Sequence, residues 1–156
     1  MSTVPGGPLP AQDWLDVIAR APLVSIDLIV RDAQQRVLVG LRRNEPAAGT
    51  WFVPGGVIRK NETLDAAFAR ITHAELGLSL PRRDARFVGV FEHLYPTNFL
   101  RAPGIGTHYV VLAHELSTTA LDRLPQEQHG DYRWMSAYEL REHPQVHPYT
   151  RAYFAA

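Results

Sequence analysis

The stretch "VPGGVIRKNETLDAAFARITHAELGL", which runs from Val53 to Leu78, decides the fold of this 156-residue chain. It opens on a Pro-Gly-Gly turn, and turns of this kind mark the boundary of a regular element. Apolar residues then recur at helical spacing from about Thr63 to Leu76, and Gly77 is a good helix stop. The stretch therefore predicts a glycine-rich loop that leads directly into an amphipathic helix.

A fixed spacing of glycine, acid and arginine runs through the same stretch. Gly56 is followed by five residues and Glu62, then by seven residues and Arg70, and Glu75 and Gly77 complete the pattern. The spacing resembles the Nudix box of diphosphate hydrolases, in which several glutamates on one helix hold divalent cations. A Gly-x5-Glu spacing alone would be weak, but the turn, the arginine and the loop–helix setting make the resemblance specific.

The box is nevertheless depleted of acids. The full pattern has an acid directly after the arginine and a pair of acids three and four residues beyond that one. Ile71 and Ala74 stand at two of these positions, and only Glu75 is an acid. A helix with a single carboxylate holds fewer cations than a full box. The motif therefore indicates either an inactive protein or an enzyme whose chemistry lies elsewhere.

Strands and helices mix irregularly along the rest of the chain. We expect helices at residues 11–20 and 136–143, a loop at 44–56, and strands at 22–30, 37–43, 85–95, 107–116 and 132–135. The first helix should bury Trp14, Val17 and Ile18, and Ser136 with Glu139 should form a capping box at the last helix. Irregular alternation favours an α+β fold with a mixed sheet over a doubly wound fold.

Composition narrows the range of partners. We expect residues 1–10 to be a flexible N-terminal lead-in and residues 11–156 to form a single domain. The charges balance, with 16 basic and 16 acidic residues, which argues against a broad nucleic-acid-binding face. No run approaches the roughly 18 apolar residues of a membrane span. The absence of cysteine fits a cytoplasmic protein. From the balanced charge and the lack of a long apolar run, we expect neither nucleic-acid nor membrane partners.

Five further stretches carry the resemblance beyond the box: "PLVSIDLIV", "WFVPGG", "THYVVL", "EQHGDYRW" and "RAYF". With them, the chain from Trp14 to Phe154 resembles the GDP-mannose mannosyl hydrolase family of the Nudix superfamily. The resemblance implies a homodimer with a Nudix fold, in which a mixed β-sheet is sandwiched between α-helices. It also implies Mg²⁺- or Mn²⁺-dependent hydrolysis of GDP-mannose to GDP and free sugar, with GDP-glucose as a further candidate substrate.

The resemblance implies one cation per active site, held by Glu75, the backbone carbonyl of Gly55 and the side chain of Gln128. Mg²⁺ takes about six oxygen ligands and commonly draws most of them from phosphates and water. A single ion on the diphosphate suits attack of water on the anomeric carbon, because GDP is then the leaving group. The site needs only to stabilise the charge that develops on that group.

Attack at the anomeric carbon has oxocarbenium character, inverts that carbon and requires a general base. The resemblance assigns the base to His129, and histidine titrates near neutral pH. It places Arg42, Arg70 and His93 on the leaving group or in support of the site. Arg70 fits a salt bridge to a box acid equally well.

The remaining site residues concern the substrate. Asp27 and Tyr109 match family site positions, and Tyr132 is a candidate sugar contact. Asp27 lies mid-strand among apolar residues, where a buried acid requires a partner. The family has an arginine directly after the double glycine, where this chain has Val57. Arg59, two residues further on, is the candidate replacement.

Three functions stay open on the sequence. The first is cleavage of the sugar–oxygen bond of a GDP-sugar. The second is a conventional Nudix pyrophosphohydrolase that cleaves a P–O bond in a nucleotide sugar or nucleoside polyphosphate, and Ile71 and Ala74 stand against it. The third is a non-catalytic nucleotide-binding module, against which Glu75, Gln128 and His129 stand together.

Overall fold

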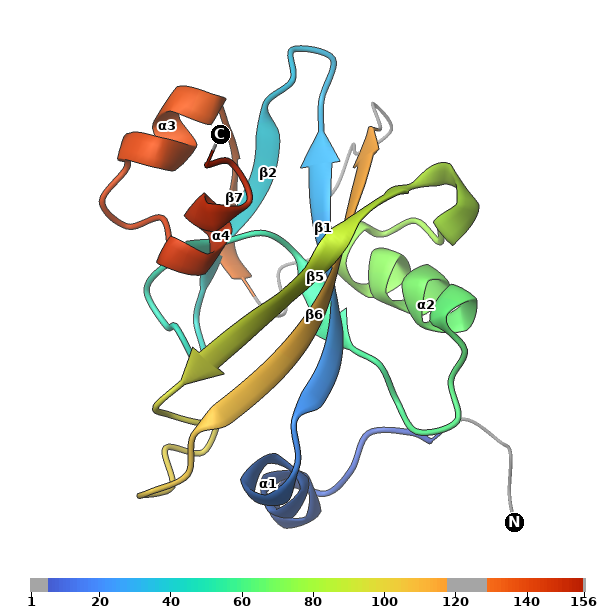
Figure 1. Cartoon of the computed structure of the whole chain (residues 1–156), viewed down its shortest axis with the longest axis vertical. Helices are drawn as coiled ribbons and strands as arrows, with labels where there is room; N and C mark the ends of the chain where they lie inside the picture. The colour runs from blue at the N-terminus through green and yellow to red at the C-terminus, as the bar shows by residue number, and fades with distance from the viewer. Residues whose placement is uncertain (1–5, 118–128, 156) are drawn as a thin grey trace.

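The computed structural model describes residues 6–117 and 129–155 and has a seven-stranded sheet at its centre (Figure 1). The strand order is β3-β2-β1-β6-β5, with β4 paired to β1 and β7 paired to β2. The elements are α1 (Ala11–Arg20), β1 (Leu23–Arg31), β2 (Val37–Arg42), β3 (Trp51–Phe52), β4 (Gly55–Val57), α2 (Leu64–Leu76), η1 (Arg82–Asp84), β5 (Arg86–Tyr95), β6 (Thr107–Ser117), β7 (His129–Met135), α3 (Ala137–Glu142) and α4 (Pro148–Ala152). In the described part of the chain, no helix has the length and apolar character needed to cross a membrane.

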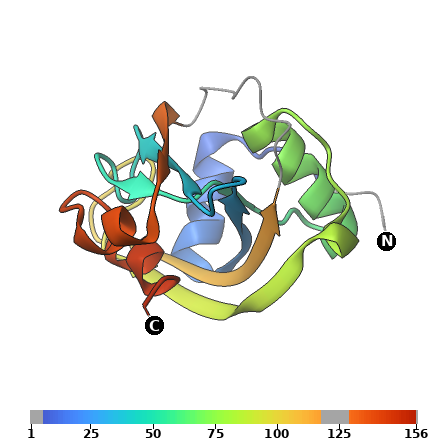
Figure 2. The same ribbon diagram turned by 90° about the horizontal axis from the view of Figure 1, so that it is seen from above.

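The sheet is mixed, as the sequence predicts. β1 and β6 run parallel, in register from Leu23 opposite Tyr109 to Arg31 opposite Ser117, and the other pairings are antiparallel. Helix α2 lies on one side of the sheet, and α3 and α4 lie on the other (Figures 1 and 2). The α+β class and the placement of the sheet between helices are both confirmed.

Strand β1 contributes to two hydrophobic cores, because successive side chains of a strand point to opposite faces. Ile26 and Leu28 pack with Phe68 on the side of α2. Ile29 belongs to the core on the other side, which includes Leu140 of α3. Asp27 faces this second side too. The acid that the sequence places mid-strand therefore points away from the box helix.

Helix α2 begins and ends where the sequence predicts. The Thr63 hydroxyl accepts a hydrogen bond from the Ala66 amide at 3.1 Å, which satisfies a free amide of the first turn. Gly77 ends the helix at a φ of 80°, a left-handed conformation that glycine adopts without a steric penalty. The last predicted helix is confirmed as well, since Ser136 and Glu139 form the expected capping box at α3.

Other predictions are corrected by the structure. Helix α1 buries Leu15 and Ile18, while Val17 is 37% exposed, so the predicted inner face was wrong at Val17. The expected loop at 44–56 contains β3 and the start of β4, because the Trp51 main chain pairs with β2. Helix α4 was missed, since its five residues are too few to show helical periodicity.

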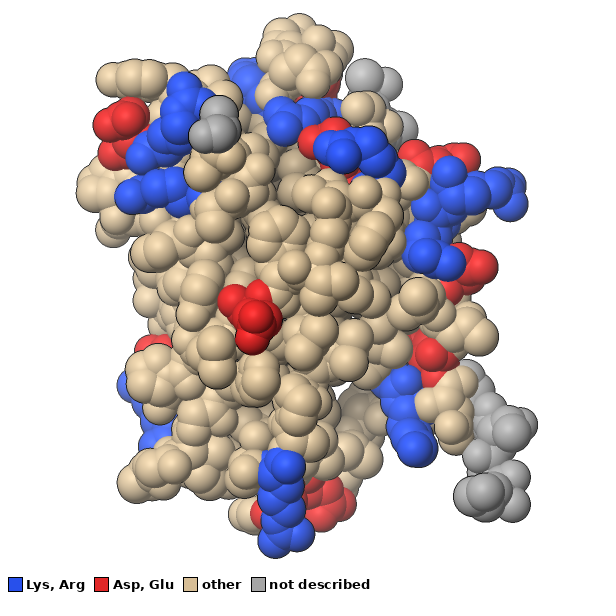
Figure 3. Space-filling model, viewed as in Figure 1, with Lys and Arg blue, Asp and Glu red and all other residues tan. Residues whose placement is uncertain are grey.

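Apolar side chains lie in open solvent along β5, the last strand in the sheet order. Phe87, Val90 and Leu94 are 53%, 60% and 56% exposed. We call these three residues the β5 face. Figure 3 shows that the surface over β5 and β6 carries few charged side chains. The β5 face is therefore apolar, whereas most of the charged groups in this view lie around it.

Candidate functional site

A cavity of about 170 Å³ lies where residues of β1, β2, β4, β5 and β6 come together. Five of the predicted site residues line it: Asp27, Arg42, Gly55, His93 and Tyr109. They come from five different strands, so no single sequence motif joins them. The fold therefore gathers in one cavity a set of groups that are far apart in the chain.

Asp27 is buried in the wall of this cavity. The Tyr153 hydroxyl donates a hydrogen bond of 2.6 Å to its Oδ2 atom. Burial raises the pKa of Asp27 to about 7, and the Tyr153 hydrogen bond and the Arg42 charge only partly offset that rise. The partner that a buried acid requires is thus Tyr153, and the carboxyl group titrates close to neutral pH.

His93, which belongs to β5, lines the same cavity as Asp27 of β1. Its ring stacks on Tyr149 with centroids 4.4 Å apart and planes 6° apart, and its Nε2 lies 3.4 Å from the Tyr153 hydroxyl. Burial, together with the smaller effect of the neighbouring His147, lowers the pKa of His93 to about 4. His93 is therefore a neutral imidazole at physiological pH, suited to hydrogen bonding rather than to charge neutralisation.

Arg42 supplies positive charge at the cavity. Its Nε donates to the Pro46 carbonyl at 2.8 Å, which fixes the side chain at the end of β2. Burial raises the pKa of Tyr109, and the Arg42 charge partly offsets this effect, so the phenol stays a hydrogen-bond donor at neutral pH. A guanidinium beside a phenol can bind phosphate oxygens directly.

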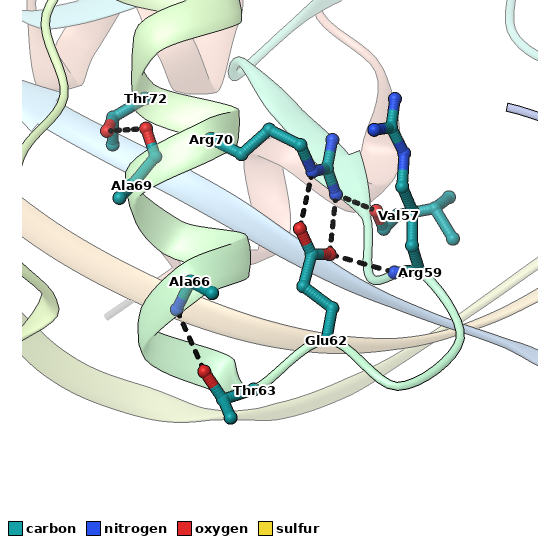
Figure 4. A network of polar contacts seen from close by, with 8 residues as sticks. All are labelled: Val57, Arg59, Glu62, Thr63, Ala66, Ala69, Arg70 and Thr72. Atoms are coloured by element: carbon teal, nitrogen blue, oxygen red, sulfur yellow. Dashed lines mark hydrogen bonds and ion pairs between the residues drawn. The ribbon is translucent and has the colours of Figure 1, made fainter. Parts of the chain in front are cut away.

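The box arginine lies outside this cavity wall, in an ion pair (Figure 4). Arg70 donates to both carboxylate oxygens of Glu62, at 2.7 and 2.9 Å, and to the Val57 carbonyl at 2.7 Å. Glu62 also accepts from the Arg59 amide at 2.9 Å, and the hydrogen bonds from Arg70 hold its pKa below the usual range. Arg70 therefore fastens the loop after β4 to α2, the salt-bridge role that the sequence left open.

Arg59 belongs to the same loop. Its amide, rather than its guanidinium, binds Glu62, and Figure 4 shows its side chain extending away from that carboxylate on the side of Val57. Val57 itself lines the cavity. Val57, where the resemblance implies an arginine, therefore places an apolar side chain in the cavity wall, and Arg59 is a nearby cation on this loop.

Packing explains one of the two depleted box positions on α2, Ile71, but not the other, Ala74. Ile71 is only 1% exposed and belongs to the core that contains Ile26, and a side chain at Gly56 would meet it at 3.0 Å. Ala74 faces solvent. Glu75, one turn after Ile71, is 3% exposed, and its charge contributes to the rise of the Tyr132 pKa to about 12 after burial. Glu75 and Tyr132 are thus close neighbours.

Two of the predicted metal ligands have donor groups of the type that a hard cation binds. Glu75 offers carboxylate oxygens and Gly55 a backbone carbonyl, both ligands that Mg²⁺ prefers. A Cβ atom at position 55 would lie 2.5 Å from Asp27 Oδ1, so only glycine allows this close packing of β4 on β1. Within residues 6–117 and 129–155, no three His, Asp or Glu side chains form a metal-binding cluster. A cation held by Glu75 and Gly55 would therefore have to complete its shell mainly with phosphate and water.

Strand β7 brings the predicted base to the same region. The His129 main chain is paired with Arg42 in the antiparallel ladder, and residues so paired have Cα atoms about 4.5–5.5 Å apart. The strand begins at His129, earlier than the predicted start at residue 132. The side chain of His129 and the whole of Gln128 lie outside the described residues, so their predicted roles stay predictions.

Three residues at the site were not predicted as site residues from the sequence. Tyr153 binds Asp27, Tyr149 stacks on His93, and His147 caps α4 through a 3.0 Å bond from the Tyr149 amide to its ring. Tyr153 falls within "RAYF", a stretch similar to the family, but nothing in that stretch indicates its partner. Only the tertiary fold brings this C-terminal segment to β1 and β5.

Comparison with known proteins defines the class. A model of the NUDIX domain matches residues 21–155. The low-salt glycan biosynthesis protein Agl8 of Haloferax volcanii is 38% identical over 149 residues, which cover 95% of this chain and 90% of Agl8. The chain belongs to the NUDIX domain family and is a Nudix hydrolase. Nudix hydrolases generally use divalent metals such as Mg²⁺ or Mn²⁺.

Solved structures confirm the Nudix fold. The MutT protein from Methanosarcina mazei has a TM-score of 0.68 at 20% identity, over 86% of this chain and 92% of its own. The MutT NUDIX hydrolase from Burkholderia pseudomallei has a TM-score of 0.67 at 25% identity, over 86% of this chain and 97% of its own. The mixed sheet between helices is thus the Nudix arrangement.

Proposed function

We propose that the protein hydrolyses GDP-mannose, with GDP-glucose as a second substrate, to GDP and free sugar by attack of water on the anomeric carbon. The observation that carries the proposal is the packing of Ile71 in the core beside a single buried box acid, Glu75. A helix built this way is poorly suited to the several cations of phosphorus chemistry. Agl8 is named for glycan biosynthesis, which draws on activated sugars, and that name supports a nucleotide-sugar substrate.

The diphosphate would bind between the cavity and α2. Arg42 and the Tyr109 hydroxyl are placed to donate to phosphate oxygens on which charge develops. Glu75, the Gly55 carbonyl and Gln128 would hold the cation, and Mg²⁺ in that place supplies neutralisation of the diphosphate charge. Arg59 is the candidate to replace the family arginine at Val57. Arg70 keeps the loop in place through Glu62.

The proton and the bonds follow from this arrangement. His129 accepts a proton from water as the water oxygen bonds to the anomeric carbon. The bond from that carbon to the phosphate oxygen breaks, and its electron pair leaves with GDP. The sugar is released with an inverted anomeric centre. Asp27 and Tyr132 are the proposed substrate contacts, and His93 supports them as a neutral hydrogen-bonding group.

Product identification tests the proposal. The protein is incubated with GDP-mannose and Mg²⁺, and the products are separated by anion-exchange chromatography. GDP and mannose are expected. GMP and mannose 1-phosphate would instead indicate the conventional pyrophosphohydrolase, and binding of GDP-sugars without turnover would indicate a nucleotide-binding module.

We also propose that the protein is a homodimer in which each subunit covers the β5 face of the other, in line with the family resemblance. Sedimentation should give the mass of a dimer for the wild type and of a monomer for Val90→Glu combined with Leu94→Glu. Leu100→Glu is the control, because Leu100 is 47% exposed but lies in the loop after β5. A wild-type monomer, or a dimer that survives the double substitution, would contradict this interface. The cytoplasmic location stays a prediction.

A further inference from the structure

Tyr153 lies directly after α4 and carries its hydroxyl group between two residues of the cavity. The hydroxyl is 2.6 Å from Asp27 Oδ2 and 3.4 Å from His93 Nε2. The Tyr153 ring packs edge-on against Phe91, with centroids 4.8 Å apart and planes at 90°. Because packing holds the ring, the hydroxyl oxygen occupies one place relative to β1 and β5.

The two oxygens of Asp27 have different surroundings. Oδ2 accepts the hydrogen bond from Tyr153, whereas Oδ1 lies against Gly55, where an added Cβ would be 2.5 Å away. Gly55 lines the cavity. The carboxylate torsion is otherwise broad, since a bond between sp³ and sp² carbons has shallow minima. The hydrogen bond from Tyr153 therefore selects the rotamer that keeps Oδ1 at the cavity side.

A proton count extends this argument to His93. A phenol has one proton, and when Asp27 is ionised the short contact to its carboxylate uses that proton. In that state the Tyr153 oxygen accepts from His93, so Nε2 of His93 carries the hydrogen. The stacked ring of Tyr149 holds the imidazole plane in place. One hydroxyl thus sets the orientation of the carboxylate and the tautomer of the imidazole.

We propose that Tyr153 is a positioning residue that orders Asp27 and His93 for substrate hydrolysis without touching the substrate. The inference depends on the proposed function only for the choice of substrate. It assigns a role to the C-terminal segment. None of the box positions and none of the proposed metal ligands lies in this segment. The segment from α4 to Tyr153 then serves as a support for side chains presented by two separate strands.

A double-mutant cycle tests the proposal with Tyr153→Phe, Asp27→Ala and the two combined. Phenylalanine keeps the ring on Phe91 and removes only the hydroxyl. Tyr153→Phe should lower kcat about tenfold, the loss expected for one hydrogen bond to a charged group, and should change KM less than about twofold. In the Asp27→Ala background the same substitution should have a clearly smaller effect, because only the longer contact to His93 is then lost. Tyr138→Phe, on an exposed side of α3, is the matched control and should leave kcat unchanged.

The stability of the same four proteins gives a readout that needs no substrate. Urea unfolding should show that Tyr153→Phe and Asp27→Ala are non-additive, because both remove one hydrogen bond. Additive losses in both kcat and stability would overturn the proposal and leave Tyr153 a packing residue. Coupling in stability without turnover of any GDP-sugar would overturn the proposed substrate but keep the hydrogen bond. Wild-type kcat in Tyr153→Phe would overturn the positioning role outright.

Discussion

The box helix α2 and the strand cavity differ in how their polar groups are used. On α2 and its loop, Glu62 and Arg70 bind each other and hold the chain together, while Ile71 fills the core. In the cavity, Asp27 and His93 are buried with pKa values of about 7 and about 4, far from their ordinary values. Strongly shifted ionisable groups in a cavity are typical of functional sites.

A Nudix box can therefore keep its loop–helix architecture while it has fewer metal-binding acids. Three residues of the box spacing serve the fold, namely Gly56, Glu62 and Arg70. Glu75 is the one box acid left for a cation. In the proposed function, the remaining chemistry falls to side chains on β1, β2, β5, β6 and β7.

Loss of the proposed base should have the largest effect. His129→Gln should lower kcat about 10²–10⁴-fold, because general base catalysis contributes that much. Steady-state kinetics at neutral pH measure the effect. His108→Gln is the control, since His108 lies on β6 but does not line the cavity. A near-wild-type rate for His129→Gln would place the base elsewhere.

Glu75→Gln tests whether α2 retains any catalytic function. It should raise the Mg²⁺ concentration needed for half-maximal rate at least about tenfold, because a ligand carboxylate is lost while its shape is kept. A Mg²⁺ titration of the rate measures the change. Glu142→Gln, at the exposed end of α3, is the control. Unchanged activation in Glu75→Gln would remove the last box acid from the metal site.

Restoring an acid to α2 should damage the fold rather than restore phosphorus chemistry. Ile71→Glu should destabilise the protein by about 3 kcal/mol or more, because it places a carboxylate in a core where Ile71 is 1% exposed. Ala74→Glu at an exposed position should fold normally. Chemical denaturation measures both. A stable Ile71→Glu protein that releases GMP would break the distinction between the two regions.

The pH dependence of stability should show the smallest effect. The pKa of Asp27 is about 7 in the folded state and 3.8 as its ordinary value, so the folded state binds its proton more tightly. The stabilisation that protonated Asp27 contributes to the folded state is present below about pH 4 and is lost as the pH rises toward 7. The melting temperature of metal-free Asp27→Asn should therefore rise relative to that of the wild type as the pH is raised from 4 to 7. The depressed pKa of His93 acts in the opposite sense in both proteins and cancels. A constant difference across this range would show that Asp27 is not buried as a neutral acid.

Local sequence patterns predicted much of the fold because their causes are local. The helix at α2 follows from Thr63, Gly77 and the apolar spacing, and the capping box at Ser136 follows from two residues. The partner of Asp27 could not be predicted, since Tyr153 lies at the other end of the chain. The sequence offered a salt bridge to a box acid as one of two roles for Arg70 and could not decide between them, because the choice depends on how the β4 loop meets α2.

The position of bond cleavage tests the central claim most directly. The reaction is run in ¹⁸O-labelled water with GDP-mannose and Mg²⁺, and the mass of the released GDP is measured. GDP is the diagnostic product because its phosphate oxygens do not exchange with water at neutral pH, unlike the anomeric oxygen of free mannose. Attack on the anomeric carbon predicts unlabelled GDP and initial release of the inverted anomer. GDP that carries one ¹⁸O atom would show attack on phosphorus and would contradict the account.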